Sequence, residues 1–88
     1  MSYELEISEH LQKIFEKIKK KDWLQAHILK KRIKDILIDP HKFKPLTANM
    51  AGQWRVHIRH YVLTYEILEN EKIVRLLDYD HHDNIYDK

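Results

Sequence analysis

The order of apolar and polar side chains predicts a strand and an amphipathic helix at the start of the chain. Residues 3 to 7 alternate between apolar and acidic side chains, which is the period of a half-buried strand. Ser8 then offers a helix N-cap, with Glu9 in the first turn. The apolar side chains that follow recur at helical spacing, at Leu11, Ile14, Phe15 and Ile18. They predict a helix with one buried face, which ends in the basic run of residues 17 to 21.

A second helix follows with start and stop signals of its own. Asp22 is placed to cap its first turn, and Gln25 is placed as the capping-box partner of Asp22. Because proline disfavours helical geometry at the preceding residue, Pro40 predicts that this helix ends at Asp39. Its buried stripe is predicted at Ala26, Leu29, Ile33, Ile36 and Leu37.

The second half of the chain changes to the period of strands. Residues 41 to 52 show no clear period and contain one of the two prolines and the only glycine, so we expect a surface connection. Strands are predicted at residues 54 to 59, 61 to 68 and 72 to 79, with a polar turn at Glu69-Asn70-Glu71. Strands joined by turns this short form an antiparallel meander.

Together these elements predict an α+β fold in a single domain that spans residues 1 to 88. The order is β-α-α-β-β-β, with the two N-terminal helices packed on one face of a small antiparallel sheet. On the second strand, Trp54, Val56 and Ile58 alternate with nitrogen-rich side chains, and successive side chains of a strand point to opposite faces. An open basic face opposite the helices is therefore expected, carrying Arg55, His57 and Arg59.

Charge is distributed unevenly along the chain. Residues 9 to 44 contain 11 Lys and Arg against five Asp and Glu, whereas residues 60 to 88 contain three against seven. The basic half suits a polyanion or an acidic protein partner. On charge alone, a solvated helical surface is the simpler explanation.

Composition excludes several other classes of protein. The chain has no cysteine, so disulfides and thiolate metal sites are excluded and an ordinary intracellular protein is expected. The N-terminus has no apolar signal core and no run approaches membrane-spanning length, so we expect a cytoplasmic protein with no membrane association. Residues 78 to 87 contain His and Asp, but adjacent His81 and His82 diverge in an extended chain. We therefore expect no metal and no other cofactor.

Two segments of the second half resemble the RelE/ParE superfamily of toxins from toxin–antitoxin modules, and more closely its RelE-like and YoeB-like ribonucleases. KPLTANMAGQWRVHIRHYVLTYEI, residues 44 to 67, is similar to an internal block of that family, and HHDNIY, residues 81 to 86, is similar to its C-terminal motif. The basic helical hairpin and the chain length also agree, so the resemblance covers nearly the whole chain. It implies a toxin that enters the ribosomal A site, cuts mRNA there and is neutralised by an acidic RelB-like antitoxin.

The resemblance also implies roles for particular residues. Arg55 and His57 fall where relatives place basic residues, Tyr86 falls on an aromatic residue that positions the target nucleotide, and His82 falls where relatives often have arginine. These four are the expected catalytic residues. The family usually has arginine directly after the tyrosine of the internal block, but here that position is Val62, so another basic residue must substitute or activity is reduced or lost. The expected phosphate and RNA contacts are Arg59, His81, Lys42 and Lys44.

Metal-independent RNA cleavage needs a base for the 2′-hydroxyl, cations around the phosphate and an acid for the leaving 5′-oxygen. Histidine suits both proton transfers because its ordinary pKa is about 6.5, whereas arginine stays charged. His57 or His82 is therefore assigned to proton transfer, with His81 in reserve, and Arg55 and Arg59 are assigned to phosphate.

Other functions stay open. A ParE-like inhibitor that binds gyrase needs no proton-transfer residues, and a third possibility is an antitoxin-binding homologue without activity. Without the resemblance, a simpler explanation of Arg55 and Arg59 is that they are solvated strand residues that pair with Glu66 across the hairpin and bind no phosphate.

Overall fold

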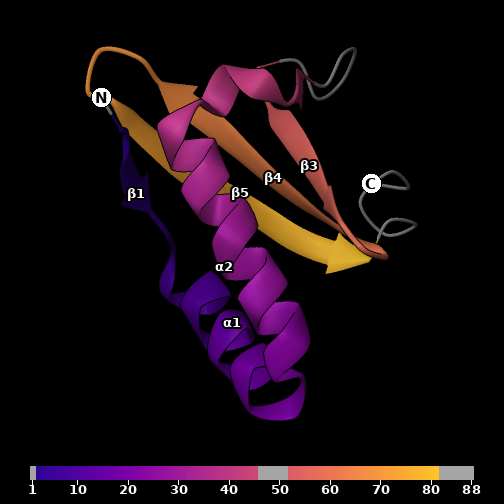
Figure 1. The fold of residues 1–88 in the computed structure, drawn as a ribbon. Helices are drawn as coiled ribbons and strands as arrows, with labels where there is room; N and C mark the ends of the chain where they lie inside the picture. Colours follow the sequence, from indigo (N-terminus) through magenta and orange to yellow (C-terminus); the bar gives the residue numbers. More distant parts are fainter. Residues whose placement is uncertain (1, 46–51, 82–88) are drawn as a thin grey trace.

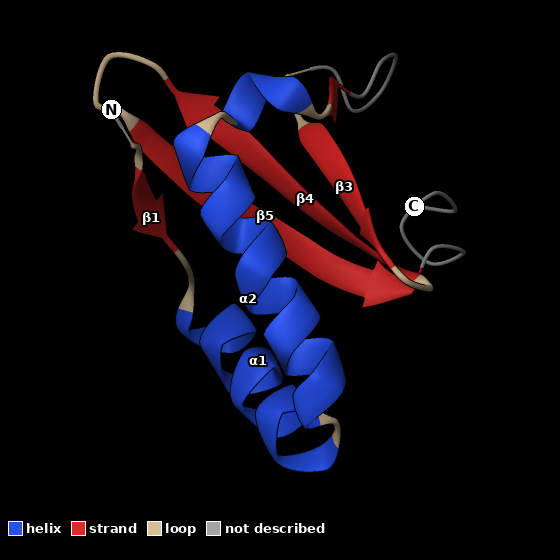
Figure 2. Cartoon of the chain, in the orientation of Figure 1, coloured by secondary structure: helices blue, strands red, loops and turns tan. Residues whose placement is uncertain are grey.

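The computed structural model describes residues 2–45 and 52–81 and places two helices against one face of a sheet (Figures 1 and 2). The long second helix crosses the sheet, and the first helix lies beside its N-terminal half. In chain order the elements are β1 (Glu4–Glu6), α1 (Glu9–Lys21), α2 (Trp23–Ile38), the 3-10 helix η1 (Pro40–Lys42), β2 (Lys44–Pro45), β3 (Trp54–Ile58), β4 (Tyr61–Leu68) and β5 (Ile73–His81).

The five strands form one sheet in the order β1-β5-β4-β3-β2. The strand β1 runs parallel to β5, and all the other pairings are antiparallel. The predicted α+β fold and the meander of β3, β4 and β5 are therefore confirmed. The sequence does not predict β2, because a strand of two residues is too short to show a period.

Both helices begin at the predicted caps. The Ser8 hydroxyl accepts a hydrogen bond from the backbone N–H of Leu11 at 3.2 Å, and a carboxylate oxygen of Asp22 accepts one from the backbone N–H of Gln25 at 3.1 Å. These bonds satisfy N–H groups that have no partner inside the helix. The helix α2 ends at Ile38, directly before Asp39, as Pro40 predicts.

The predicted capping-box role of the Gln25 side chain is wrong. Gln25 is buried, and its Nε2 donates to the Tyr79 hydroxyl at 2.7 Å and to the backbone carbonyl of Ile58 at 3.4 Å. A buried amide must find partners inside the protein, and those partners lie on the sheet. The side chain therefore connects α2 to β3 and β5.

The hydrophobic core lies between the helices and one face of the sheet, which we call the helix side; the opposite face is the outer face. Core side chains come from both helices and from β3, β4 and β5: Leu11, Leu29, Ile36, Val56, Ile58, Leu63, Tyr65, Val74, Leu76 and Tyr79. Between Thr64 and Tyr65 the register of β4 against β5 shifts, because Thr64 pairs with Asp78 whereas Tyr65 pairs with Leu76. The extra residue is Leu77, which makes a bulge in β5.

A buried hydroxyl fixes the segment that leads from α2 to β2. Tyr65 is fully buried, and its hydroxyl donates to the backbone carbonyl of Pro40 at 2.6 Å. Burial, together with the negative charge of Asp39, raises the pKa of Tyr65, so the hydroxyl stays protonated and keeps its donor. The bond holds η1 against the sheet and so sets where β2 begins.

A second cluster lies at the same end of the sheet, at the turn between β4 and β5. One carboxylate oxygen of Glu69 pairs with the His41 ring, and the other accepts a hydrogen bond from the Tyr3 hydroxyl at 3.1 Å. The His41 ring also meets the Trp54 ring edge-on, at 5.5 Å between centroids. Partial desolvation opposes ionisation, but the hydrogen bonds from His41 and Tyr3 and the charges of His41 and Lys72 lower the pKa of Glu69.

Replacing Tyr65 by phenylalanine is expected to destabilise the fold. The Pro40 carbonyl loses its donor while it stays buried, which costs about 1 to 3 kcal/mol of unfolding free energy. Urea denaturation followed by circular dichroism measures the change. Tyr61→Phe is the matched control, because the Tyr61 side chain is exposed, and its effect is expected to stay below about 0.5 kcal/mol. Equal effects of the two substitutions would contradict the assigned role of the Tyr65 hydroxyl.

Glu69 is expected to contribute to acid unfolding. Because its folded-state pKa is below the ordinary value of 4.5, the stability that ionised Glu69 adds is present above that value and is lost as pH falls through the folded-state pKa. The wild type should therefore lose more unfolding free energy than Glu69→Gln between about pH 5 and about pH 3. Urea titrations at each pH test this, and parallel pH profiles of the two proteins would exclude the contribution.

Candidate functional site

Arg55 and His57 lie on the outer face of β3, as predicted. Val56 and Ile58 are 6% and 1% exposed and belong to the core on the helix side, so the alternate side chains point away from the helices. His57 is exposed, whereas Arg55 is half-buried and its Nε atom is enclosed. The guanidinium of Arg55 is thus held close to the sheet, and the imidazole of His57 is accessible from solvent.

The neighbouring strands add one cation and two small side chains to this face. Lys44 of β2 stands opposite Arg55 on one side, and Thr64 of β4 stands opposite Arg55 on the other. Val62 of β4 stands opposite His57. Directly paired residues have Cβ atoms about 5 Å apart, so Lys44 and Arg55 place two positive charges side by side on the outer face.

Acidic residues also lie on the outer face, and two of them on β5, Asp78 and Asp80, were not among the site residues expected from the sequence. The register of β4 with β5 pairs Thr64 with Asp78 and Val62 with Asp80. A carboxylate oxygen of each Asp accepts a hydrogen bond from the next backbone N–H, at 2.9 Å for Asp78 and 2.7 Å for Asp80. Adjacent strands lie about 4.8 Å apart, so β3 and β5 are separated by about 10 Å across β4. The outer face therefore has Arg55 and His57 on β3 and two carboxylates on β5, with Val62 and Thr64 of β4 between them.

The prediction that Arg59 continues the outer row is wrong. The strand β3 ends at Ile58, and Arg59 begins the turn to β4 with a left-handed backbone, φ 61°. Its Nη1 donates to the side-chain oxygen of Gln25 at 3.3 Å, so the guanidinium lies toward α2. Strand alternation stops where the strand stops, and the turn directs Arg59 to the helix side.

The other expected RNA contacts are spread over the molecule. His81 ends β5 opposite Tyr61 and meets the Tyr61 ring edge-on at 5.7 Å, which places it on the helix side, away from Arg55 and His57. Lys42 lies in η1 with its Nζ 5.9 Å from the centroid of the Phe43 ring. Lys44 is the only one of these contacts that the structure brings beside Arg55. The two remaining expected catalytic residues, His82 and Tyr86, lie outside the described residues.

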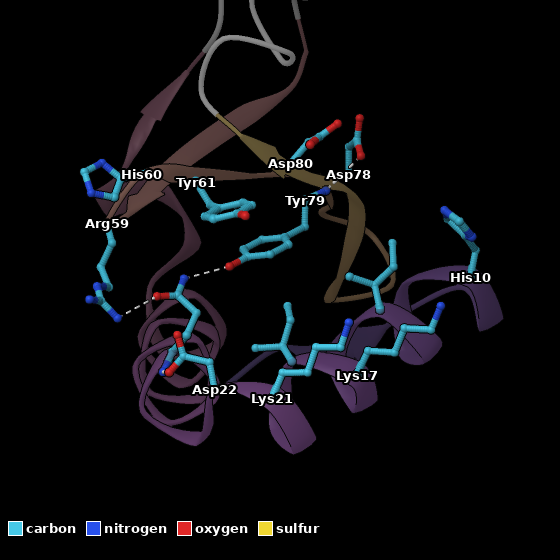
Figure 3. Close-up of a pocket in the computed structure, with 13 residues that line it drawn as sticks. His10, Lys17, Lys21, Asp22, Arg59, His60, Tyr61, Asp78, Tyr79 and Asp80 are labelled. Carbon is cyan, nitrogen blue, oxygen red and sulfur yellow. Dashed lines mark hydrogen bonds between the residues drawn. The ribbon is translucent and has the colours of Figure 1, made fainter.

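A pocket of about 680 Å³ opens on the helix side, between α1, the start of α2 and the ends of β4 and β5 (Figure 3). Its apolar walls are formed by Ile14, Ile18 and two tyrosines, Tyr61 and Tyr79. The two tyrosine rings stack with centroids 5.2 Å apart and an interplanar angle of 7°. Burial raises the pKa of Tyr79, although the hydrogen bond from Gln25 opposes this effect. The pocket therefore has a flat aromatic wall and a protonated phenol.

Basic side chains surround this pocket. Lys17 and Lys21 extend along it from α1, and Arg59 borders it from the turn between β3 and β4. Asp78 and Asp80 also border it, but Figure 3 shows their carboxylates directed away from the tyrosine rings. The acid of Asp22 is engaged as the cap of α2. The pocket is apolar inside, and its rim carries the cations Lys17, Lys21 and Arg59 together with three carboxylates.

Among residues 2–45 and 52–81, no group of three or more His, Asp or Glu side chains is arranged to hold a metal ion. Over the same residues, none of the helices is long and apolar enough to cross a membrane.

A helical hairpin on a mostly antiparallel sheet of five strands is the RelE-like fold. One chain of the toxin–antitoxin complex RelBE2 from Mycobacterium tuberculosis superposes with a TM-score of 0.76 at 22% identity, over 93% of this chain and 100% of that one. A family model described as the ParE toxin of type II toxin–antitoxin systems matches residues 3–86.

Relatives with higher sequence identity occur in archaea. A Methanocaldococcus jannaschii protein named "Putative toxin RelE4" is 40% identical over 87 residues, which are 98% of this chain and 93% of that protein. An uncharacterised protein of Methanosarcina mazei is 45% identical over 85 residues, which are 96% and 99% of the two chains. The chain therefore belongs to the RelE/ParE superfamily of toxins of type II toxin–antitoxin systems.

Proposed function

We propose that this toxin is a ribosome-dependent endoribonuclease that cuts mRNA and so inhibits translation in the cytoplasm. The observation that carries the proposal is the outer-face row of Arg55 and His57 beside Lys44. An exposed imidazole beside Arg55 and Lys44 combines a group that transfers protons near neutral pH with groups that bind phosphate.

The proposed reaction is a transesterification at one phosphodiester of the mRNA. A base removes the proton of the 2′-hydroxyl, whose oxygen attacks phosphorus, and the bond from phosphorus to the 5′-oxygen breaks. An acid donates a proton to the leaving oxygen, so the products are a 2′,3′-cyclic phosphate and a 5′-hydroxyl. Arg55 and Lys44 stabilise the charge on the phosphate, and His57 serves in proton transfer.

The expected partners of His57 come from the C-terminal segment. In this proposal His82 is the second proton-transfer residue and Tyr86 positions the target nucleotide, both by resemblance to the family. Arg59 has no part in it, because its guanidinium lies on the helix side. His81 lies on that side as well, so it is a poorer candidate for proton transfer than His82.

The proposed protein partner is a RelB-like antitoxin with acidic and apolar segments. The helix-side pocket supports this partner, since its apolar tyrosine wall and its lysine rim complement such a segment. The related chain from M. tuberculosis belongs to a toxin–antitoxin complex, RelBE2. An antitoxin that covers α1 would also mask cations that contact RNA.

A second candidate is gyrase inhibition without nuclease activity. The family model is that of ParE toxins, and Val62 is a fully buried apolar residue on the outer face where RelE-like relatives have arginine. A protein that acts only by binding gyrase needs no charged centre at this position.

Arg55→Ala is expected to lower mRNA cleavage about 10²- to 10⁴-fold, because the phosphate loses the cation closest to His57 on β3. Cell-free translation followed by primer extension on the mRNA measures the cuts. His10→Ala and His27→Ala are the matched controls, since these exposed histidines lie on the helices, and both should cut as the wild type does. Circular dichroism checks that Arg55→Ala is folded.

Two outcomes would change the proposal. Undiminished cleavage in the His57→Ala, His82→Ala double variant would exclude histidine proton transfer and leave electrostatic catalysis by the cations. No cleavage by the wild type, together with inhibition of gyrase supercoiling, would replace the nuclease proposal by the ParE-like function.

Lys21→Glu is expected to weaken binding of the antitoxin encoded beside the toxin by about tenfold or more, because it places a negative charge on the pocket rim. Isothermal titration calorimetry with the purified antitoxin measures the affinity. Lys30→Glu is the matched control, since Lys30 is exposed on α2 and does not line the pocket. Equal affinities of the two variants would place the antitoxin elsewhere.

A further inference from the structure

The connection between the two helices exposes two large apolar side chains. Trp23 is 72% exposed and Leu24 is 46% exposed, and both lie in the first turn of α2. Neither is needed to start the helix, because Asp22 supplies the cap. Burying an aromatic side chain of this size would stabilise the fold, so the exposed indole calls for an explanation outside the fold.

Three exposed lysines stand directly before these residues. Lys19, Lys20 and Lys21 form the last turn of α1, and only Asp22 separates them from Trp23. The chain spans at most about 3.6 Å per residue, so the Cα atoms of Lys20 and Trp23 lie within about 11 Å of each other. We call residues 19–24 the hairpin tip. In Figure 1 the tip projects beyond the sheet, at the end of the two helices.

The positive charge of the tip continues along α1. A shallow groove of about 330 Å³ runs along this helix, and three lysines of one helical stripe border it, at positions 13, 17 and 20. Glu16 is the one acidic residue in its lining. A polyanion bound along α1 can therefore extend to Trp23, and in this groove only the charge of Glu16 repels it.

We infer that the hairpin tip binds single-stranded RNA, with Trp23 stacked on an unpaired base and the lysines of α1 on the phosphates. Proteins that bind single strands combine an aromatic ring for the base with a positively charged track for the backbone, and the tip holds both. This inference rests on the proposed function, which brings the protein to RNA, but it uses a surface separate from Arg55 and His57.

Other occupants fit the tip less well. A stable protein interface buries about 1,200 to 2,000 Å², which one indole and one leucine on a projecting tip do not approach. A second copy of the chain would set lysines against lysines. A single stacked base needs only the area of one ring, and on an aromatic residue it is typically worth about 5- to 100-fold in affinity.

The test uses the full chain with Arg55→Ala, which removes the proposed nuclease activity, and a short fluorescein-labelled oligouridylate followed by fluorescence anisotropy. Trp23→Ala in this background should weaken binding about 5- to 100-fold, and Trp23→Phe should keep most of the affinity because the ring still stacks. Ile38→Ala is the matched control, since Ile38 is 69% exposed at the other end of α2, and it should bind as the parent does. Lys20→Gln should reduce the slope of log K against the logarithm of the salt concentration by about 0.7, because one phosphate contact is lost.

Three results would overturn the inference. The first is oligouridylate binding that does not depend on Trp23, or that Ile38→Ala weakens equally. The second is a blue shift of tryptophan emission on phosphatidylserine vesicles that Trp23→Ala abolishes, with no effect of Trp23→Ala on oligouridylate binding, which would make the tip a lipid-surface element. The third is a loss of antitoxin affinity in Trp23→Ala while RNA affinity is kept.

Failure of the inference is distinguishable from failure of the proposed function. If wild-type chain cuts mRNA in cell-free translation but oligouridylate binding is independent of Trp23, the nuclease proposal stands and the tip inference falls. If no cleavage occurs but Trp23 contributes to oligouridylate affinity as expected, the tip inference stands and the nuclease proposal falls.

Discussion

The buried amide of Gln25 is the contact that sets how the helices sit on the sheet. Its nitrogen donates to the Tyr79 hydroxyl on β5 and to the Ile58 carbonyl at the end of β3, and its oxygen accepts from Arg59 in the turn. Loss of this amide would leave buried polar groups on two strands without partners, at a cost of about 1 to 3 kcal/mol for each group. The helix can therefore dock in one position only, and that position decides which side chains border the pocket and which remain on the outer face.

This arrangement separates two surfaces with different chemistry. The outer face has Arg55 and Lys44 on one side of the central strand β4 and Asp78 and Asp80 on the other, so it carries polar groups of both signs. The helix side has an apolar, aromatic wall, with both cations and carboxylates at its rim. Arg59 connects the two, since the turn that ends the outer row on β3 also delivers its guanidinium to the pocket.

Much of this fold follows from local patterns in the sequence. The caps Ser8 and Asp22 and the strands of the meander are set by neighbours within a few residues, so periodicity is enough to predict them. The position of Gln25 on the core side of α2, the left-handed backbone of Arg59 and the short strand β2 depend on tertiary packing. Strand alternation predicts the outward direction of Arg55 and His57, and it applies equally to Asp78 and Asp80. The position of these carboxylates across β4 from the cations depends on the register of β5 with β4, which the sequence pattern does not give.

Val62 bears most directly on the chemistry of the outer face. It is fully buried between His57 on β3 and Asp80 on β5, so the centre of this face has an apolar side chain at the position where the resemblance implies an arginine. A guanidinium at that point would pair with a carboxylate on β5 and hold a charge over the middle of the sheet. In this chain Lys44 of β2 and Arg55 of β3 carry positive charge at one side of this face, whereas Arg75 of β5 is engaged with Glu6 and Glu66. In the proposed reaction, a phosphate bound at Arg55 and Lys44 would have Asp78 and Asp80 across β4, and these carboxylates would weaken its binding. In the proposed reaction, charge neutralisation at the phosphate therefore falls to Arg55 and Lys44, because no cation stands at the position of Val62.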